Sequence, residues 1–77
     1  MLTLYGTEGC HLCHDAQMVL RQLNLAWNDV DIIEDDLLLE TYGTRIPVLR
    51  SQGKELDWPF TQVHVLDWLS GEVNAPG

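Results

Sequence analysis

The segment Gly9-Cys10-His11-Leu12-Cys13-His14 lies between a short apolar stretch and a stretch with helical periodicity, and it contains both cysteines of the chain. Two thiols three positions apart at the start of a helix lie on one face, so a small adjustment of the first turn allows a disulfide. The segment therefore predicts thiol chemistry. The same letters spell CxxCH, the attachment pattern of c-type haem, so the spacing alone leaves both chemistries open.

Length and composition indicate one small folded unit. A chain of 77 residues is the size of a single domain, and an apolar fraction of 45% with 21% charged residues is typical of globular proteins. We expect the domain to span residues 1–70 and to be a monomer. Residues 71–77 contain Pro76 and two glycines without periodicity, which predicts a flexible C-terminal tail.

The net charge argues against two classes of binding partner, nucleic acids and anionic membranes. Twelve acidic residues against four basic ones give a net charge of −8, which repels the phosphate backbone of nucleic acids and anionic lipid surfaces. The N-terminus lacks the charged start of a secretory signal, and no apolar run approaches the ~20 residues that span a bilayer. We therefore expect a cytoplasmic protein that binds neither nucleic acid nor membrane. In a reducing cytosol, a lone CxxC pair is catalytic or metal-binding more often than structural.

Apolar patterning predicts four strands and three helices. The expected strands are residues 1–5, 27–33, 46–50 and 54–56, with a turn at 51–53 joining the last two. The expected helices are residues 12–24, a short one that starts at the acidic run 34–36 and ends at Gly43, and a last one with Pro59 in its first turn. The stripes expected to face the core are Leu12, Ala16, Val19, Leu20 and Leu23 in the first helix, and Val63, Leu66 and Leu69 in the last.

This order of elements resembles the thioredoxin fold and, within it, the glutaredoxin family. The two most specific marks are Cys10-His11-Leu12-Cys13 after the first strand and Arg45-Ile46-Pro47-Val48 at the start of the third. Residues 40–49, followed by Gly53-Lys54-Glu55-Leu56, are especially similar to the small bacterial glutaredoxin-like proteins. The resemblance implies an α/β domain of βαβαββα order, with a four-stranded mixed sheet and helices on both faces.

The resemblance also implies a thiol-disulfide oxidoreductase that acts on protein or small-molecule disulfides and holds no bound cofactor. Cys10 is the expected nucleophile, because the N–H groups and dipole of the following helix favour its thiolate and lower its pKa below that of a free thiol. Cys13 is the expected resolving thiol. His11, as a cation, would stabilise the thiolate further, whereas Glu8 and Asp15 act in the opposite direction.

Substrate contacts are expected beside the cysteine pair, at the start of the third strand. The resemblance implies a cis peptide bond before Pro47, which would present the free backbone groups of Ile46 to an extended substrate. The chain lacks the basic residue before the first cysteine and the Gly-Gly pair with an Asp after the hairpin, which hold the carboxylates of glutathione in its usual users. Arg45 is a candidate replacement anion contact, and Asp57 and Trp58 are expected to line the groove, although Trp58 suits packing against the last helix equally well. Glutathione thus stays a candidate co-substrate only.

Three other interpretations use the same residues. In c-type haem attachment, Cys10 and Cys13 would be thioether anchors and His14 an axial ligand, but the chain offers few remote second ligands. In a metal or iron–sulfur module, the cysteines with His11 or His14 form an incomplete set that two chains would have to share. In an adaptor, a thioredoxin-fold groove would bind a partner without redox turnover. The leading interpretation is the oxidoreductase.

Overall fold

The elements follow the predicted βαβαββα order, with one added 3₁₀ turn before the second helix. A computed structural model describes residues 2–73. Its elements are β1 (Thr3–Gly6), α1 (His11–Gln22), β2 (Asn28–Asp31), the 3₁₀ turn η1 (Ile32–Glu34), α2 (Asp36–Tyr42), β3 (Val48–Ser51), β4 (Lys54–Asp57) and α3 (Gln62–Val73).

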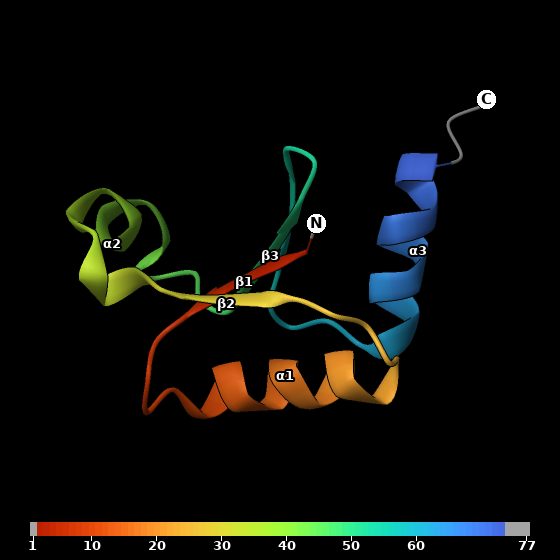
Figure 1. Ribbon diagram of the computed structural model, residues 1–77, viewed down its shortest axis with the longest axis horizontal. Coiled ribbons are helices and arrows are strands. Elements are labelled where there is room, and N and C mark those ends of the chain that lie inside the picture. Colours follow the sequence, from red (N-terminus) through yellow and green to blue (C-terminus); the bar gives the residue numbers. More distant parts are fainter. Residues whose placement is uncertain (1, 74–77) are drawn as a thin grey trace.

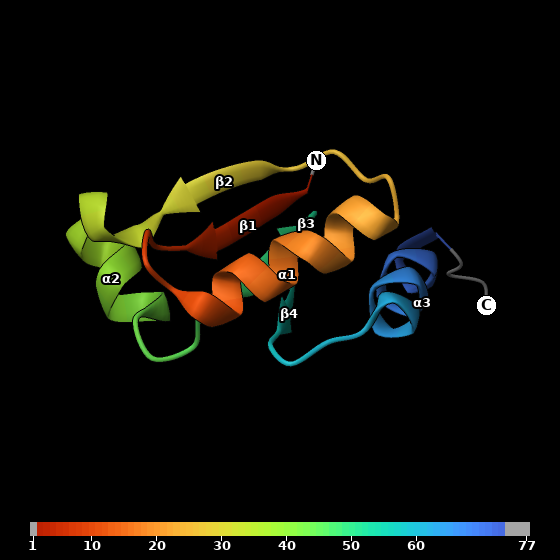
Figure 2. The same ribbon diagram turned by 90° about the horizontal axis from the view of Figure 1, so that it is seen from below.

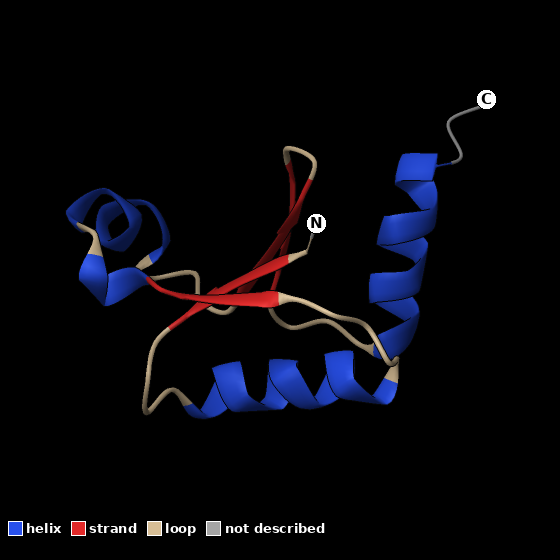
Figure 3. Cartoon of the chain, viewed as in Figure 1, coloured by secondary structure: helices blue, strands red, loops and turns tan. Residues whose placement is uncertain are grey.

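The four strands form one mixed sheet in the order β2-β1-β3-β4 (Figure 1, Figure 3). β1 and β2 run parallel, with Thr3 opposite Asn28, and α1 supplies the crossover that a parallel pair requires. β3 is antiparallel to both β1 and β4, and its register places Val48 opposite Tyr5. The predicted mixed sheet is therefore confirmed.

Helices cover both faces of the sheet because the side chains of the central strands alternate between them. On one face, α1 lies across the sheet and α3 stands beside it (Figure 2), around a core formed by Leu2, Leu4, Ala16, Leu20, Leu49, Phe60 and Val65. On the other face, η1 and α2 enclose a smaller core formed by Ile32, Tyr42 and Val48. The helices on both faces are confirmed.

The second strand is shorter than predicted because Asp31 turns the chain out of the sheet. The Asp31 carboxylate accepts a hydrogen bond from the Ile33 N–H at 3.0 Å, and this starts η1. Asp35 then caps α2 by accepting from the N–H groups of Leu37 and Leu38, at 2.8 and 3.3 Å. The acidic run therefore starts the short helix as predicted. Gly43 ends it with a right-handed φ of −53°, not with the left-handed turn that a terminal glycine usually supplies.

The stripe predicted for α1 is correct except at its first residue. Ala16 and Leu20 are buried, and Val19 and Leu23 pack against them. Leu12 is 46% exposed, because it lies at the margin of a buried stripe that runs through Cys13.

The prediction for the start of α3 was wrong, and the prediction for its inner face was right only at Leu69. Pro59 lies outside the helix, its peptide bond with Trp58 is cis, and α3 begins only at Gln62. Val63 and Leu66 are 64% and 48% exposed, whereas Leu69 packs against the core as predicted. Val65, which is fully buried, and Trp68 complete the inner face. Both stripes are compatible with a helical period, and the buried Phe60 in front of the helix lies in the same core as Val65.

The predicted flexible tail begins too early. Residues 71–73 belong to α3, which ends at Val73. Residues 74–77, the rest of that tail, lie outside the described residues.

Candidate active site

Cys10 is the N-cap residue of α1. Its backbone is extended, with φ −85° and ψ 111°, and its Sγ accepts a hydrogen bond from the Cys13 N–H at 3.1 Å. Gly9 before it has a φ of +82°, a conformation that glycine adopts without steric cost. The sulfur therefore lies among the unsatisfied N–H groups of a helix N-terminus, where negative charge is stabilised.

Cys10 and Cys13 form a disulfide, with their Cα atoms 5.2 Å apart. Cys13 is 5% exposed and Cys10 is half-buried. A thiol-reactive partner therefore reaches Cys10 more easily than Cys13. The predicted pairing at the start of the helix is confirmed, and the exposures suit an outer attacking sulfur and an inner resolving one.

Gly6, the last residue of β1, makes room for the inner cysteine. A Cβ atom on Gly6 would lie 2.9 Å from Cys13 Sγ, closer than real Cβ contacts. The strand and the start of α1 thus meet at the disulfide because β1 ends without a side chain.

The histidines beside the cysteines are exposed. His11 is the first residue of α1, and His14 lies one turn further on. Neither imidazole makes a hydrogen bond or ion pair within the described part of the chain. The predicted effect of His11 on the thiolate stays a prediction.

Pro47 lies at the same end of the sheet as the disulfide. The β1–β3 register pairs Tyr5 with Val48, so its continuation brings Pro47 opposite Gly6, the residue that contacts Cys13. The Ile46–Pro47 peptide bond is cis, and the Pro47 side chain is fully buried.

The backbone of Ile46 is less free than predicted. Its N–H donates to the Tyr42 carbonyl at 3.1 Å, because the turn after α2 folds back on that helix. The expectation that both backbone groups of Ile46 would be free for a substrate is therefore wrong for the N–H. The Ile46 side chain packs against the smaller core.

Arg45 and Asp57 lie together, but as partners of each other. Arg45 Nη2 is 2.7 Å from Glu55 Oε1 and 2.8 Å from Asp57 Oδ1, and its guanidinium lies 5.2 Å from the centre of the Tyr42 ring. Asp57, and then Glu55, raise the pKa of Arg45. The structure thus contradicts the expectation of a free anion contact at Arg45, because two carboxylates of β4 already neutralise it.

Tyr42 and Glu55 complete this cluster, and the sequence analysis missed both. The Tyr42 hydroxyl donates to Glu55 Oε2 at 2.7 Å, and its ring stacks on Tyr5 with 4.4 Å between centroids. The hydrogen bond from Arg45, and then that from Tyr42, lower the pKa of Glu55. The hydrogen bond to Glu55, and then burial, raise the pKa of Tyr42. The sequence gives no signal of this contact, because Tyr42 lies in α2 and Glu55 in β4, and only the tertiary fold brings these elements together.

Of the two expectations for Trp58, lining the groove or packing in the interior, the structure favours packing. Its ring lies edge-on to Phe60, with centroids 4.9 Å apart and planes at 77°, and it packs against the larger core. The backbone N–H of Trp58 donates to the Pro47 carbonyl at 3.2 Å, so this residue also holds the segment around Pro47 in place.

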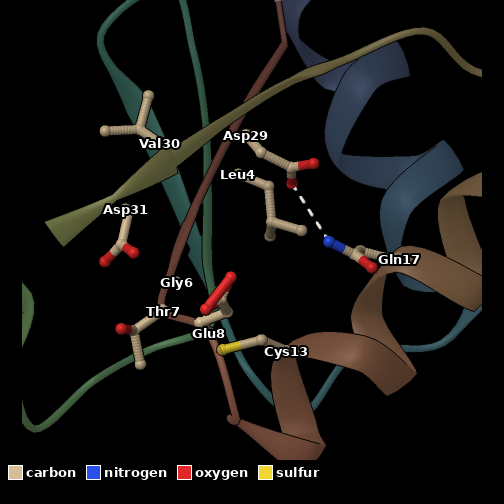
Figure 4. A pocket seen from close by; sticks show the side chains of 9 residues that line it. All are labelled: Leu4, Gly6, Thr7, Glu8, Cys13, Gln17, Asp29, Val30 and Asp31. Atoms are coloured by element: carbon tan, nitrogen blue, oxygen red, sulfur yellow. Dashed lines mark hydrogen bonds between the residues drawn. The ribbon is translucent and has the colours of Figure 1, made fainter.

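A surface cavity of about 260 Å³ opens beside the inner cysteine, between α1 and the β1–β2 edge of the sheet (Figure 4). It is lined by Leu4, Gly6, Thr7, Glu8, Cys13, Gln17, Asp29, Val30 and Asp31. The sequence analysis did not predict this cavity. The alternation of Asp29 and Asp31 in a strand was its only signal, because that spacing places both residues on one face.

The described residues offer neither a metal site nor a membrane-spanning helix. Within residues 2–73, no group of three or more histidine, cysteine, aspartate or glutamate side chains is arranged to hold a metal ion. None of the described helices has the length and apolar character needed to cross a membrane.

Three features define a thioredoxin-fold protein with a CxxC disulfide. They are the order of the strands in the sheet, the helix that begins at the CxxC pair, and the proline opposite the end of β1. The family model of the Glutaredoxin-like domain (DUF836) matches residues 1–70. The chain belongs to this glutaredoxin-like family.

Solved structures agree with this assignment. The X-ray structure of target protein XcR50 from X. campestris is 44% identical, covers 99% of this chain and 100% of its own, and has a TM-score of 0.87. Protein Ne2328 from Nitrosomonas europaea is 30% identical over 87% of both chains, with a TM-score of 0.76. The thioredoxin-like protein BC3987, at 22% identity, 90% and 99% coverage and a TM-score of 0.64, is similar in fold. Among curated proteins, none matches the chain significantly.

Proposed function

We propose that this protein is a thiol-disulfide oxidoreductase of glutaredoxin type. The observation that carries the proposal is the disulfide between Cys10, the half-buried N-cap of α1, and the buried Cys13. A sulfur at a helix N-terminus is stabilised as a thiolate, and the thiolate is the nucleophile in disulfide exchange.

The reaction runs in two exchanges. In the reduced protein, the Cys10 thiolate attacks one sulfur of a substrate disulfide, a Cys10–substrate bond forms, and the second substrate sulfur leaves as a thiolate. Cys13 loses its proton and attacks Cys10 Sγ, which releases the first substrate sulfur and closes the Cys10–Cys13 disulfide. Two electrons pass to the substrate, whose two thiolates take up the proton released by Cys13 and one proton from solvent, which replaces the proton that Cys10 lost when it ionised. An external thiol reductant then restores the dithiol.

The surrounding residues have supporting roles in this proposal. His11, exposed beside Cys10, would stabilise the thiolate as a cation. Pro47 and the Ile46 carbonyl, just before the start of β3 and next to the end of β1, would contact the substrate near the disulfide.

The proposal requires no bound cofactor, because the two thiols supply the electrons. Its partners are protein or small-molecule disulfides, with glutathione as a candidate co-substrate. It places the protein in the cytoplasm, where thiol reductants keep such pairs reduced, and treats it as a monomer. It involves neither nucleic acid nor membrane.

Two cysteine variants test the proposal. Cys10→Ser should abolish reduction of a neutral probe such as bis(2-hydroxyethyl) disulfide, followed through release of its thiol. Cys13→Ser should accumulate a mixed disulfide on Cys10, detected by a mass increase that dithiothreitol removes. Serine keeps the size of the side chain, so circular dichroism should show both variants folded.

An adaptor without redox turnover predicts a different outcome. In that case the reduced wild-type protein would release thiol from the probe no faster than its Cys10→Ser variant does.

A further inference from the structure

The cavity beside Cys13 carries negative charge that no cation of the described chain balances. Its lining includes the carboxylates of Glu8, Asp29 and Asp31 and no lysine or arginine (Figure 4). The chain has four basic residues, and none of them lines this cavity. The guanidinium of Arg45 is engaged by two carboxylates of β4.

Each of these carboxylates keeps an oxygen for an incoming cation. Asp29 Oδ1 accepts from Gln17 at 3.2 Å and from Trp27 at 2.8 Å, which orients the carboxylate. Asp31 Oδ1 accepts from the Ile33 N–H at 3.0 Å. The second oxygen of each has no donor within residues 2–73, and Glu8 is exposed without an ion pair in that part of the chain. The internal bonds therefore hold the carboxylates in place without neutralising them.

Part of the remaining lining is apolar, beside the polar side chains of Thr7 and Gln17. The Leu4 side chain provides an aliphatic wall, and Gly6 with Cys13 forms the end nearest the disulfide. A volume of about 260 Å³ admits one long side chain. Lysine and arginine suit such a site, because their methylene stems pack on apolar walls while the charged ends reach polar groups.

We propose that this cavity binds a lysine or arginine side chain of the disulfide substrate, so that the protein selects protein disulfides flanked by basic residues. This inference rests on the proposed oxidoreductase function. A substrate joined to Cys10 lies next to the cavity, because Cys13, the disulfide partner of Cys10, forms part of its wall. The same carboxylates disfavour anionic disulfides, and oxidised glutathione is one of these.

The test compares three disulfide-cyclised peptides that differ only in their flanking residues, which are lysine, glutamine or glutamate. Stopped-flow measurements give the rate at which the reduced protein reduces each peptide at low ionic strength. Each rate is divided by that of dithiothreitol, a neutral reductant, with the same peptide, which removes differences in intrinsic disulfide reactivity. We expect the lysine peptide to react about tenfold faster than the glutamate peptide, as is usual for electrostatic steering into a charged cleft.

Matched variants separate the cavity from the overall charge. The triple variant Glu8→Gln, Asp29→Asn, Asp31→Asn keeps acceptor oxygens for Gln17, Trp27 and Ile33, and we expect its lysine-to-glutamate ratio to fall to within about twofold of one. The control triple variant changes net charge by the same amount, at exposed residues outside the cavity. Its substitutions are Asp36→Asn, Glu40→Gln and Asp67→Asn. We expect it to keep most of the ratio.

The outcomes are distinct. If the wild-type protein fails to reduce the glutamine peptide, the oxidoreductase function itself is wrong. If it reduces that peptide but shows a ratio near one, the cationic subsite is wrong and the oxidoreductase stands. A control triple variant that lowers the ratio as much as the cavity variant also overturns the subsite, because the selectivity would then come from net charge.

Discussion

The Cys13 sulfur occupies the space that a side chain on Gly6 would fill, with only 2.9 Å between Sγ and the position of a Cβ on Gly6. This contact joins the end of β1 to the first turn of α1. The cysteine pair is thus positioned by the sheet as well as by its own helix.

Gly6→Ala should disturb the site through this contact. The added methyl group must displace Cys13 or the strand, and overpacking of this kind costs about 1–3 kcal/mol. We expect a lower urea midpoint and slower closure of the Cys10–Cys13 disulfide after mixed-disulfide formation, measured by acid quenching. Gly53→Ala is the control, since its left-handed φ of +83° costs about 1–2 kcal/mol at a turn with no atom near the new methyl group. Equal effects of both variants on disulfide closure would contradict the role of the Gly6 contact.

Cys10 should react as a thiolate at a lower pH than free cysteine. In reduced Cys13→Ser protein, where Cys10 is the only thiol, we expect iodoacetamide alkylation to be half-maximal below pH ~8.5, the usual pKa of cysteine. The reason is that Cys10 caps α1. His11→Gln should raise that pH if the adjacent imidazole stabilises the thiolate as proposed. Alkylation that titrates like a free cysteine peptide would refute this prediction.

Tyr42→Phe should destabilise the protein without changing the ring packing. The variant keeps the stack on Tyr5 but loses the 2.7 Å hydrogen bond to Glu55. A hydrogen bond to a charged group contributes about 1.5 kcal/mol, so urea unfolding should show a loss of this order. An unchanged midpoint would mean that water replaces the carboxylate at no cost.

Glu55 should make stability depend on pH in the acid range. Its pKa is lowered in the folded state by Arg45 and then Tyr42, so the stabilisation is present above the unfolded-state pKa of about 4.5 and is lost as the pH falls through the lower folded-state pKa. We expect wild-type protein to exceed Glu55→Gln in urea midpoint at pH 7, and the difference to shrink towards pH 3. Glu40→Gln, on the exposed surface of α2, is the control and should show little difference at either pH. A gap that widens in acid would contradict the assignment.

The inner face of α3 can be tested with two valines. Val65 is fully buried and Val63 is 64% exposed. Val65→Ala should cost about 2 kcal/mol, whereas Val63→Ala should stay within about 0.5 kcal/mol of wild type. Both changes alter helix propensity equally, so the difference in urea midpoint reports burial. Equal losses would show that the helix is turned differently.

Prediction from sequence succeeded where the signal is local. The order of elements, the start of α2 at the acidic run 34–36 and the disulfide-ready spacing of Cys10 and Cys13 depend on residues close together in the chain. It failed for the face of α3, because stripes through Val63 and through Val65 are both compatible with a helical period. Packing against Phe60 and α1 decides which stripe is buried, and the residues next to Val63 and Val65 in the sequence do not indicate this packing.

The candidate site also combines features with a local sequence signal and features set by tertiary packing. The sequence by itself determined that two thiols lie at the start of a helix after a strand, because separations of three or four residues have a fixed geometry in a helix. Only the tertiary structure decided that Arg45 pairs with Glu55 and Asp57, and that Glu8, Asp29 and Asp31 meet beside Cys13. These groups come from different strands, loops and helices, and their neighbours are set by the pairing of the sheet and by the crossover of α1, not by their spacing along the chain.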